Sequence, residues 1–425
     1  MANFPDVSGS TNLAALNTPL QSVKLKREAE RNTFWIPMAT DLSVWKRGYE
    51  VKPGIVLRKT ELLKEGYDSI RMPVLKRLSD EPTYGDNQLE GNEEDQNLQY
   101  VEVKVNRVKH AVKSSGAEAR RRLKKVNPFS EARPQLSQYF SKALDIDGWR
   151  GFTRGYSNNL LAAKANGGIL VNSGTQVSHP NMFVNGLAAG SAFSDTTDTG
   201  LVLWNATPAT YETNVSGAID AQGTDSSAFM SLQVLDRLVP QITNLEIEPL
   251  DINGQDFYVC SLHQAQWMQM AENAGSLRNL LEKVDQGMGE KSAIFSGATY
   301  MYSGGGYRFI FQEAKNSPGV SSSGTVTTYE FASNMTRGTQ TQRIGGIMGQ
   351  GALMYATAEP LGFVDRDIDY KSYKGVQAAT SYGYARTDLI KDDGTTWSAR
   401  DGKNRSSMAF ITYSPRGAIT SASAV

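Results

Sequence analysis

The sequence predicts an α+β fold, and three of its features support that prediction. Two strand-like runs, 68–78 and 99–112, flank an acidic segment rich in turn residues. A later segment repeats apolar residues every three or four positions, which is the period of an amphipathic helix. From residue 225 onward, short apolar runs alternate with further helical patterns, which predicts a mixed α/β subdomain. At 425 residues, with 40% hydrophobic residues, the chain is long enough to bury a large core in two or more subdomains.

The first 65 residues are expected to form an arm and a lead-in to the body. Residues 1–30 are rich in Ser, Asn, Thr and Leu and turn basic at Lys24, Lys26 and Arg27. Arms of this kind become ordered only when they dock. We therefore expect an extended arm whose order depends on assembly.

The runs 68–78 and 99–112 are predicted to form the two arms of one long β-hairpin. Val101, Val103 and Val105 alternate with polar residues, so the three valines share one face of a strand. Each arm has about 10 residues and, at roughly 3.3 Å per residue, reaches about 33 Å from its base. A two-stranded ribbon is only marginally stable alone in water, so an arm of this length needs a partner surface.

Charges are segregated around this hairpin. Segment 79–96 holds seven acidic residues and no Lys or Arg, whereas residues 104–133 carry ten Lys and Arg. Opposite charges segregated in this way suit a protein that meets copies of itself, because complementarity sets the register of pairing. A solvated acidic turn beside a solvated basic helix would give the same pattern, and both interpretations stay open here. The candidate intersubunit contacts are Asp86, Glu90, Glu93, Glu94, Arg120, Arg121 and Arg122.

The formal net charge is zero, with 44 basic and 44 acidic residues. Dedicated DNA-binding domains carry a basic excess that gains affinity by releasing counterions from phosphate. Strong DNA binding by the chain as a whole is therefore not expected. The local cluster 120–125 can touch nucleic acid, but its neighbours favour a helical face that pairs with acidic residues of another subunit.

The clearest helical pattern follows the hairpin. Asn127 and Pro128 offer a cap and a first-turn proline, whereas Pro134 either kinks the helix or marks its true start. The apolar stripe consists of Leu136, Tyr139, Phe140, Ala143 and Leu144.

Residues 157–222 are rich in Gly, Ser, Thr, Asn and Ala, with turn signals such as Asn185-Gly186. A segment this long without clear periodicity is either a decorated surface region or a set of short irregular strands. His179 lies in it without a second metal ligand nearby, so we expect a structural role for this histidine.

Regular patterns return after residue 225. A helix is expected that Asp225 or Ser226 caps and that ends at or near Pro240. A strand at 257–260 leads to Ser261, which is expected to cap a helix running to about residue 272.

The C-terminal third is expected to continue this pattern. A further helix is expected over 276–287, and a hairpin should turn at the glycine run 303–306. The glycine-bearing apolar run 344–358 indicates closely packed, buried backbone. The run 408–413 is expected to return the chain to a peripheral part of the molecule.

Motifs for catalysis are poor throughout the sequence. The string 287–292 resembles the end of a phosphate-binding loop, but its first glycine is misplaced. The three histidines lack metal-ligand spacing, and Cys260 lies in an apolar run typical of a buried, inert thiol. The carboxylates of Glu90, Glu93 and Glu94 can hold a cation or form an acid and base pair, but a hairpin turn offers little burial to shift a pKa. We therefore expect no catalytic residue, no cofactor and no metal.

No run of about 18 apolar residues is present, so no transmembrane helix is predicted. The N-terminal sequence also lacks the charged and apolar regions of a signal peptide. We expect assembly in a reducing cytoplasm, where the lone Cys260 forms no intrachain disulfide.

The most distinctive string is Tyr-Gly-Asp-Asn-Gln-Leu-Glu-Gly-Asn-Glu-Glu at 84–94. Together with Asp-Ser-Ile-Arg-Met-Pro at 68–73 and Arg-Val-Lys-His-Ala-Val at 107–112, it resembles the major capsid proteins of tailed bacteriophages, a family assigned the Hong Kong 97-like fold. A Gly-Asp that usually precedes the first strand is replaced here by Gly-Tyr-Asp. Weaker similarity continues through 256–307 and 344–386.

The resemblance implies a major capsid protein, without catalytic activity, that self-assembles into the icosahedral head of a tailed double-stranded DNA phage. In the family, a long spine helix follows the hairpin. The divisions it implies are an N-terminal arm and lead-in at 1–65, an extended hairpin (E-loop) at 66–112, a spine helix and peripheral domain with a Gly/Ser/Thr/Asn-rich insertion at 113–224, a mixed α/β axial domain at 225–365, and a return to the peripheral domain at 366–425.

The partners implied by the resemblance are copies of the chain itself, as pentamers and hexamers, with a separate scaffolding protein, a portal protein and a possible decoration protein. The shell is expected in the virion after assembly in the host cytoplasm, enclosing DNA without sequence-specific binding and without a membrane. Two alternatives stay open: a soluble α/β enzyme of unknown substrate, and a decoration or scaffolding protein, although the latter tend to be shorter or more helical.

Overall fold

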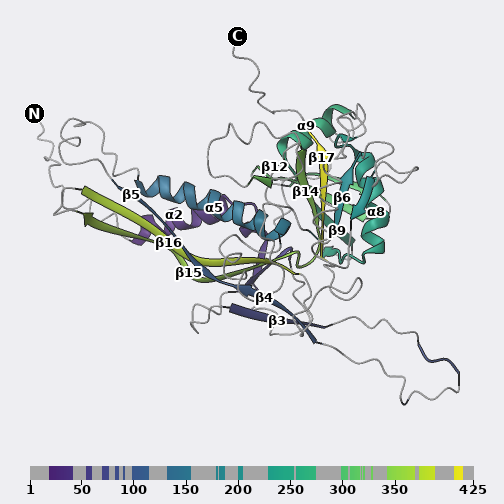
Figure 1. Ribbon diagram of the computed structural model, residues 1–425, viewed down its shortest axis with the longest axis horizontal. Coiled ribbons are helices and arrows are strands. Elements are labelled where there is room, and N and C mark those ends of the chain that lie inside the picture. Colours follow the sequence, from purple (N-terminus) through teal and green to yellow (C-terminus); the bar gives the residue numbers. More distant parts are fainter. Residues whose placement is uncertain are drawn as a thin grey trace, which may run out of the picture.

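A computed structural model of the chain shows an α+β fold built on two large β-sheets and one short two-stranded ribbon (Figure 1). The predicted fold class is therefore confirmed. The residues it describes are 19–41, 54–59, 69–75, 82–85, 90, 98–113, 132–154, 179, 181–186, 200–203, 228–252, 255–273, 298–304, 307–315, 317, 319–320, 327–328, 342–368, 373–387 and 406–414.

The first large sheet has five strands in the order β1-β2-β15-β16-β5. Its centre is the long antiparallel pair β15–β16. β1 and β2 add parallel strands on one side, and β5 runs antiparallel to β16 on the other. The strands are β1 (Ala39–Asp41), β2 (Val56–Lys59), β5 (Asn106–Lys113), β15 (Leu353–Ile368) and β16 (Tyr373–Arg386).

The helix predicted after the hairpin is confirmed as α5 (Ala132–Arg154), which lies along one face of this sheet (Figure 1). Its 23 residues give a length of about 34 Å. Leu136 and Phe140 are buried in one cluster with Val376 of β16. Pro134 lies in the first turn of α5, where backbone N–H groups have no acceptor within the helix. Its missing N–H therefore costs no hydrogen bond, and Pro134 belongs to the start of the helix.

The segment expected to be an extended arm is helical where it is described. α2 (Pro19–Arg31) packs against α5, and the hydroxyl of Ser137 in α5 donates a hydrogen bond to the carbonyl of Leu25. The expectation of an extended arm over residues 1–30 is wrong for 19–30, because Leu25 and the buried Ala29 have the four-residue spacing of a helix face. Residues 1–18 lie outside the described residues. The short 3-10 helix η1 (Ile36–Met38) follows α2.

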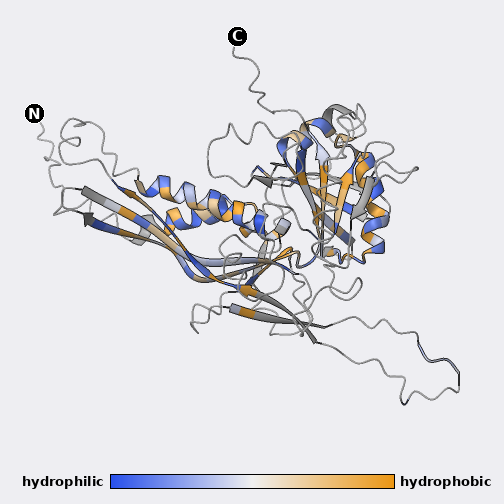
Figure 2. Cartoon of the chain, viewed as in Figure 1, coloured by the Kyte–Doolittle hydropathy of each residue, from blue (hydrophilic) through white to orange (hydrophobic). Residues whose placement is uncertain are grey.

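The second sheet has ten strands, seven of them in the order β10-β11-β9-β14-β17-β6-β7. β8 pairs with β9, and β12 joins β13 to β14. Figure 2 shows apolar residues gathered on the strands of this sheet and along α5. The strands are β6 (Met182–Asn185), β7 (Gly200–Leu203), β8 (Leu250–Ile252), β9 (Gln255–Leu262), β10 (Ala298–Gly304), β11 (Tyr307–Glu313), β12 (Gly319–Val320), β13 (Thr327–Thr328), β14 (Gln342–Met348) and β17 (Ser407–Tyr413).

Several sequence predictions for this sheet are confirmed. β10 and β11 form the antiparallel hairpin expected around the glycine run 303–306. The glycines of β14 are closely packed, since a Cβ on Gly345 would lie 2.2 Å from the ring of Phe410. The described part of 157–222 contains β6 and β7, and the side chains of β6 are buried. Short strands, rather than surface decoration alone, therefore account for part of that segment.

The run 408–413, expected to return the chain to the peripheral domain, joins the ten-stranded sheet rather than the five-stranded one. It forms β17, which lies between β14 and β6 in the ten-stranded sheet. Met408, Ala409, Phe410 and Ile411 are all fully buried, so both faces of this strand are covered. Such a strand belongs at the centre of a sheet, which explains its position.

Helices α8 (Leu232–Asn244) and α9 (Gln264–Asn273) differ from the sequence predictions at their ends. The N-cap position of α8 is Ser231, and the helix continues past Pro240 because the buried face reaches Ile242. Ser261, expected to cap α9, lies in β9. His263 replaces it, because its Nδ1 accepts the N–H of Ala265.

The helix expected over 276–287 lies outside the described residues. Among the helices of the described part, none is long and apolar enough to cross a membrane.

The two sheets share one hydrophobic core where the C-terminal half of α5 meets both of them. Trp149 and Phe152 of α5 pack with Trp35, which follows α2, and with buried residues from both sheets. The Trp35 and Trp149 rings lie 5.0 Å apart in an edge-to-face arrangement. Gly148 makes this packing possible, since a Cβ there would lie 2.2 Å from Trp35. One continuous core therefore fixes the body from which the hairpin projects.

Candidate assembly surfaces

The base of the predicted hairpin is a two-stranded ribbon of β3 (Ser69–Leu75) and β4 (Leu98–Lys104). The strands are antiparallel, with Ser69 opposite Lys104 and Leu75 opposite Leu98. The ribbon begins beside the five-stranded sheet and points away from it (Figure 1). This confirms the hairpin pairing of the two strand-like runs over seven residues of each.

The ribbon is fixed to the face of the five-stranded sheet that is opposite α5. Val103 is fully buried, with Leu57, Met354 and Ala385 in the same cluster and Ile70 packed against it. Strand alternation predicted that the valines share one face of the strand. That face of β4 contacts this cluster. Fully burying a valine side chain contributes about 1.5–3 kcal/mol, so Val103 is an anchor for the hairpin.

Backbone contact between the ribbon and β16 is unusually close at Gly383. A Cβ at this position would lie 2.0 Å from the carbonyl oxygen of Lys104. Only glycine leaves room for β4 to cross β16 at this distance. The position of the ribbon therefore depends on a residue more than 270 positions away in the sequence.

The run 99–112 was expected to be one arm of a single ribbon, and the structure divides it. β4 pairs with β3, but after Val105 the chain continues as β5, which pairs with β16 from Asn106↔Tyr382 to Lys113↔Gly375. Apolar residues of β5 explain the change, because Val108 and Val112 pack against α5 and its neighbours. At its base, the paired ribbon therefore ends at Lys104, and the rest of the predicted arm belongs to the five-stranded sheet.

Most of the predicted contact residues lie outside the described residues. Glu90 is described, in a turn, and it is exposed. Nearby, Tyr84 is 71% exposed and Gly85 has a left-handed φ of 69°, as a turn requires. The positions that lie outside the described residues are Asp86, Glu93, Glu94, Arg120, Arg121 and Arg122.

Beyond the ribbon, the same face of the five-stranded sheet is exposed. Val376, Ala378, Val108 and Phe363 face α5. Strand alternation then places the intervening residues on the opposite face. We call this surface the open sheet face; its exposed charged and large apolar residues are Arg107, Lys109, Lys113, Glu359, Val364 and Arg366.

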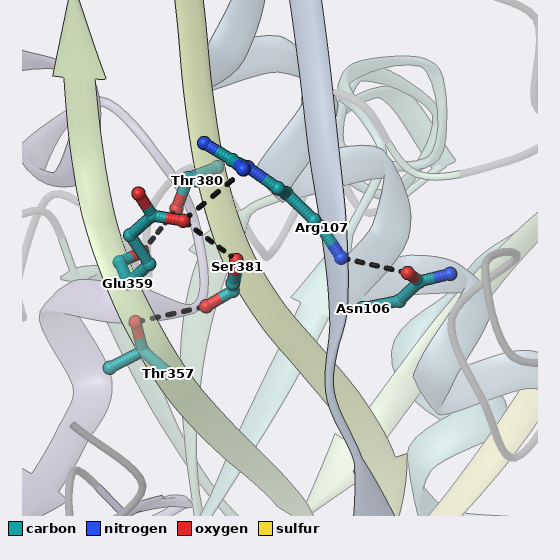
Figure 3. A network of polar contacts seen from close by, with 6 residues as sticks. All are labelled: Asn106, Arg107, Thr357, Glu359, Thr380 and Ser381. Carbon is teal, nitrogen blue, oxygen red and sulfur yellow. Dashed lines mark hydrogen bonds and ion pairs between the residues drawn. The ribbon is translucent and has the colours of Figure 1, made fainter. Parts of the chain in front are cut away.

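A polar network marks the end of the open sheet face nearest the ribbon (Figure 3). The guanidinium of Arg107 lies 3.5 Å from the Glu359 carboxylate, which also accepts a hydrogen bond from the Ser381 hydroxyl at 3.1 Å. The hydroxyl of Thr380 donates to the backbone carbonyl of Glu359 at 3.0 Å. The Arg107 and Glu359 side chains are 60% and 48% exposed, so this ion pair contributes little in the isolated chain.

Buried titratable groups in the core form structural contacts. Tyr382 donates a hydrogen bond of 2.6 Å to Asp147, which also pairs with Arg150 at 2.8 Å. Burial, and then the Asp147 carboxylate, raise the pKa of Tyr382 well above its ordinary value. The phenol therefore stays protonated and ties β16 to α5.

His179 has the structural role that the sequence predicts. Its Nδ1 accepts the N–H of Asn181 at 3.1 Å, so its Nε2 carries the proton and donates to the Ser407 hydroxyl at 3.1 Å. Burial, and then the charge of Arg386, hold its pKa well below the ordinary value. This histidine links the start of β6 to β17.

Cys260 is the only cysteine of the sequence, and it is buried. Burial raises the pKa of the Cys260 thiol well above its ordinary value, so the thiol is inert. Within the residues that the structure describes, no group of three or more His, Cys, Asp or Glu side chains is placed to hold a metal ion.

Sequence reasoning missed Glu359, Ser381 and Val364 as surface residues of interest. The sequence pattern that would place them on a surface is weak. Two register irregularities in β15, between Thr357 and Gly362, break the two-residue alternation of the strand. The alternation resumes at Phe363 and Val364, and reading it from there places Val364 on the exposed face.

Comparison with known proteins agrees with this architecture. The family model described as phage capsid protein matches residues 11–414. No curated protein sequence matches the chain significantly.

Solved structures share the fold at low sequence identity. The capsid of Ralstonia phage GP4 has a TM-score of 0.55 at 18% identity, covering 86% of this chain and 88% of that one. The cyanophage Pam1 capsid asymmetric unit has a TM-score of 0.56 at 14% identity, covering 91% and 93%. The acidic stable capsid of Helicobacter pylori bacteriophage KHP30 has a TM-score of 0.52 at 12% identity, covering 86% and 92%.

The family match spans nearly the whole chain, and the two-sheet body with its long helix corresponds to the fold of these capsid subunits. The chain belongs to the phage capsid protein family and is a structural subunit of a phage head rather than an enzyme.

Proposed function

We propose that this chain is the repeating subunit of a closed icosahedral shell, built from pentamers and hexamers of itself, that encloses double-stranded DNA. The proposal rests on the family and on the anchored ribbon, which gives the acidic segment 79–96 a fixed starting point on the body. The net charge of zero supports a shell that holds DNA without sequence-specific binding.

The proposed fold is Hong Kong 97-like. In this assignment the five-stranded sheet with α2 and α5 is the peripheral domain, and α5 is the spine helix. The ten-stranded sheet with α8 and α9 is the axial domain that surrounds a symmetry axis of a capsomer. Segment 66–112 supplies the extended loop, although its β5 part belongs to the peripheral sheet.

Assembly is proposed to depend on contact between the hairpin of one subunit and the next subunit. The candidate acidic partners are Asp86, Glu90, Glu93 and Glu94, and the candidate basic partners are Arg120, Arg121 and Arg122. Opposite charges at such a contact set register and suppress wrong pairings. The tight anchoring of Val103 supports this, because it gives each arm a defined direction.

Other components of the particle are proposed from the family alone. They are a separate scaffolding protein, a portal protein and a possible decoration protein, with assembly in the host cytoplasm before the subunit becomes part of the virion. A separate scaffold predicts that shells form efficiently only when the chain is co-expressed with it.

The test is a double charge reversal, Glu93→Lys with Glu94→Lys, in the full chain co-expressed with a candidate scaffold. Negative-stain electron microscopy and sedimentation velocity should show closed shells for the wild type and a marked loss of shells for the variant. A matched control, Asp256→Lys with Glu313→Lys, makes the same charge change at exposed positions of the ten-stranded sheet and should assemble. Normal shells from the Glu93 and Glu94 variant would refute the proposed role of the hairpin.

A further inference from the structure

The chain passes from the ten-stranded sheet to the five-stranded sheet through a short segment that is hydrogen-bonded to both. Residues 349–352, which we call the connector, join β14 to β15. The N–H of Gly349 donates to the carbonyl of Ser406, just before β17, at 2.8 Å. The N–H of Gly351 donates to the carbonyl of Gly54, which precedes β2, at 2.9 Å. The connector is therefore fixed to both sheets.

Close packing holds the connector in one backbone conformation. A Cβ on Gly349 would lie 2.0 Å from the carbonyl oxygen of Glu248, which also accepts the N–H of Gln350 at 3.0 Å. Gly351 has a left-handed φ of 66°, which favours glycine. Its carbonyl accepts a hydrogen bond from the hydroxyl of Thr387, the residue after β16.

A buried charge lies at the same place, at the end of β16. Arg386 is 3% exposed and pairs in register with Leu353, the first residue after the connector. Its guanidinium donates to the carbonyl of Phe152, near the end of α5, at 2.8 Å. The Phe152 ring packs on β14, where a Cβ on Gly346 would lie 2.7 Å from it, and it lies 4.9 Å from the ring of His179. Arg386 thus ties β16 to the side chain that contacts the ten-stranded sheet.

Directional contacts at this place act differently from apolar packing. Burial of apolar surface is non-directional, so it holds the two sheets together without selecting one angle between them. Hydrogen bonds depend on angle as well as on distance, so they favour one relative orientation. A buried charge seldom adds stability over apolar residues of similar volume, and setting register is its best-attested use. The Arg386 contact is therefore suited to fixing orientation.

We infer that Arg386 and the connector set the angle between the two sheets, and that this angle sets the curvature of the shell. The inference rests on the proposed function, because it requires subunits that repeat around closed symmetry axes. The same contacts recur in every copy, so a small change of angle is multiplied around each ring and changes the size at which the assembly closes. Arg386 is a positioning residue, since it is buried within the subunit and acts through the orientation of the sheets.

The first test measures the diameter of shells formed by the full chain with a candidate scaffold. Arg386→Met removes the charge and the hydrogen bond but keeps a long, unbranched side chain. Cryo-electron microscopy should show one diameter for the wild type. In the variant, shells of that diameter should fall about tenfold in favour of other sizes or open sheets, which matches the loss of one hydrogen bond to a charged group. Thr387→Val is a milder variant that removes only the bond to Gly351, and it should shift the sizes in the same way.

Tyr382→Phe is the matched control. It also removes a buried hydrogen bond between β16 and α5, the 2.6 Å bond to Asp147, but it leaves the connector and Arg386 unchanged. Its melting temperature should fall, and its shells should keep the wild-type diameter. Wild-type diameters in both Arg386→Met and Thr387→Val, or the same mixture of sizes in Tyr382→Phe, would overturn the inference.

The second test measures the angle itself in the full chain expressed without scaffold. Spin labels on Lys109→Cys in β5 and Glu313→Cys in β11 occupy exposed positions, one on each sheet, and the native Cys260 is buried. The distance distribution from pulsed electron paramagnetic resonance should be narrow in the wild type and roughly twofold broader with Arg386→Met, because more orientations become populated. Tyr382→Phe should keep the wild-type width.

The outcomes separate this inference from the proposed function. Failure of the wild type to form shells with any scaffold would overturn the proposed function, and the curvature claim with it. Closed wild-type shells, combined with an unchanged distance distribution in Arg386→Met, would overturn only the inference. A broader distribution in a variant whose shells keep the wild-type diameter would also overturn only the inference, because the angle would then not set the curvature.

Discussion

Gly383 gives the sharpest test of how the hairpin is anchored. In the variant Gly383→Ala, the new Cβ would lie 2.0 Å from the Lys104 carbonyl oxygen and 3.4 Å from Cγ1 of Val103. Real Cβ contacts essentially never fall below 3.0 Å, so β4 has to move away from β16 by about 1 Å. Overpacking of this kind costs about 1–3 kcal/mol. Because the clash lies at the ribbon, the loss of stability is expected first in β4.

Hydrogen exchange measures this local effect. A loss of about 1–3 kcal/mol should raise the exchange rates of the β4 amides about five- to 150-fold, with little change in β9 or β14. The matched control is Gly362→Ala in β15, where the nearest atom to the new Cβ is the Pro360 carbonyl oxygen at 4.0 Å. That change should stay within about 0.5 kcal/mol. If both variants exchange alike, the close crossing does not hold the ribbon and the reasoning fails.

Three further predictions concern the body. Phe140→Ala empties a fully buried site between α5 and β16, and chemical denaturation should show a loss of about 3–5 kcal/mol; a loss below about 1 kcal/mol would contradict the packing. Tyr382→Phe deprives the buried Asp147 of its 2.6 Å hydrogen bond and should cost about 1–3 kcal/mol by the same assay, so an unchanged midpoint would refute this contact. The pKa of His179 is lowered by folding, so the unfolded chain binds the proton first: the stability that this histidine contributes is complete above pH 6.5 and falls below it, by up to about 1.4 kcal/mol per pH unit. His179→Gln should reduce the difference in unfolding free energy between about pH 7 and pH 5.5. The same difference in the variant and the wild type would exclude His179 as the cause.

The helices and strands whose pattern lies in the local sequence were predicted well. α5 was found from Leu136, Phe140 and Ala143, because in its N-terminal half one face of the helix packs on one sheet and the apolar residues repeat with the helical period. The hairpin β10–β11 was found from its glycine turn. In these elements, local pattern and tertiary contact agree.

Other elements were set by partners that the local sequence does not reveal. α8 continues beyond Pro240 because burial of Ile242 outweighs the missing N–H of proline. The break between β4 and β5 depends on β16, a strand far along the chain. The place of β17 depends on β6, which lies in a segment of low periodicity. Contacts of this kind are long-range, so no local pattern carries them.

The predicted intersubunit contacts are residues of the hairpin segment and of the basic run that follows it. The sequence identified the charge segregation around the hairpin, and Glu90 is exposed as expected of a contact residue. It did not identify the open sheet face, because Arg107 and Val364 are 257 positions apart in the sequence and only the fold brings their strands into one sheet. All seven predicted contact residues, Glu90 among them, stay predictions as contacts.

The central claim is that copies of this chain build a shell through the acidic hairpin segment. The most direct measurement is a three-dimensional electron microscopy reconstruction of the particles formed by the full chain with its scaffold. The account predicts closed icosahedral shells in which residues 79–96 of each subunit lie on a neighbouring subunit. Monomers or dimers only, or shells in which that segment folds back on its own subunit, would contradict it.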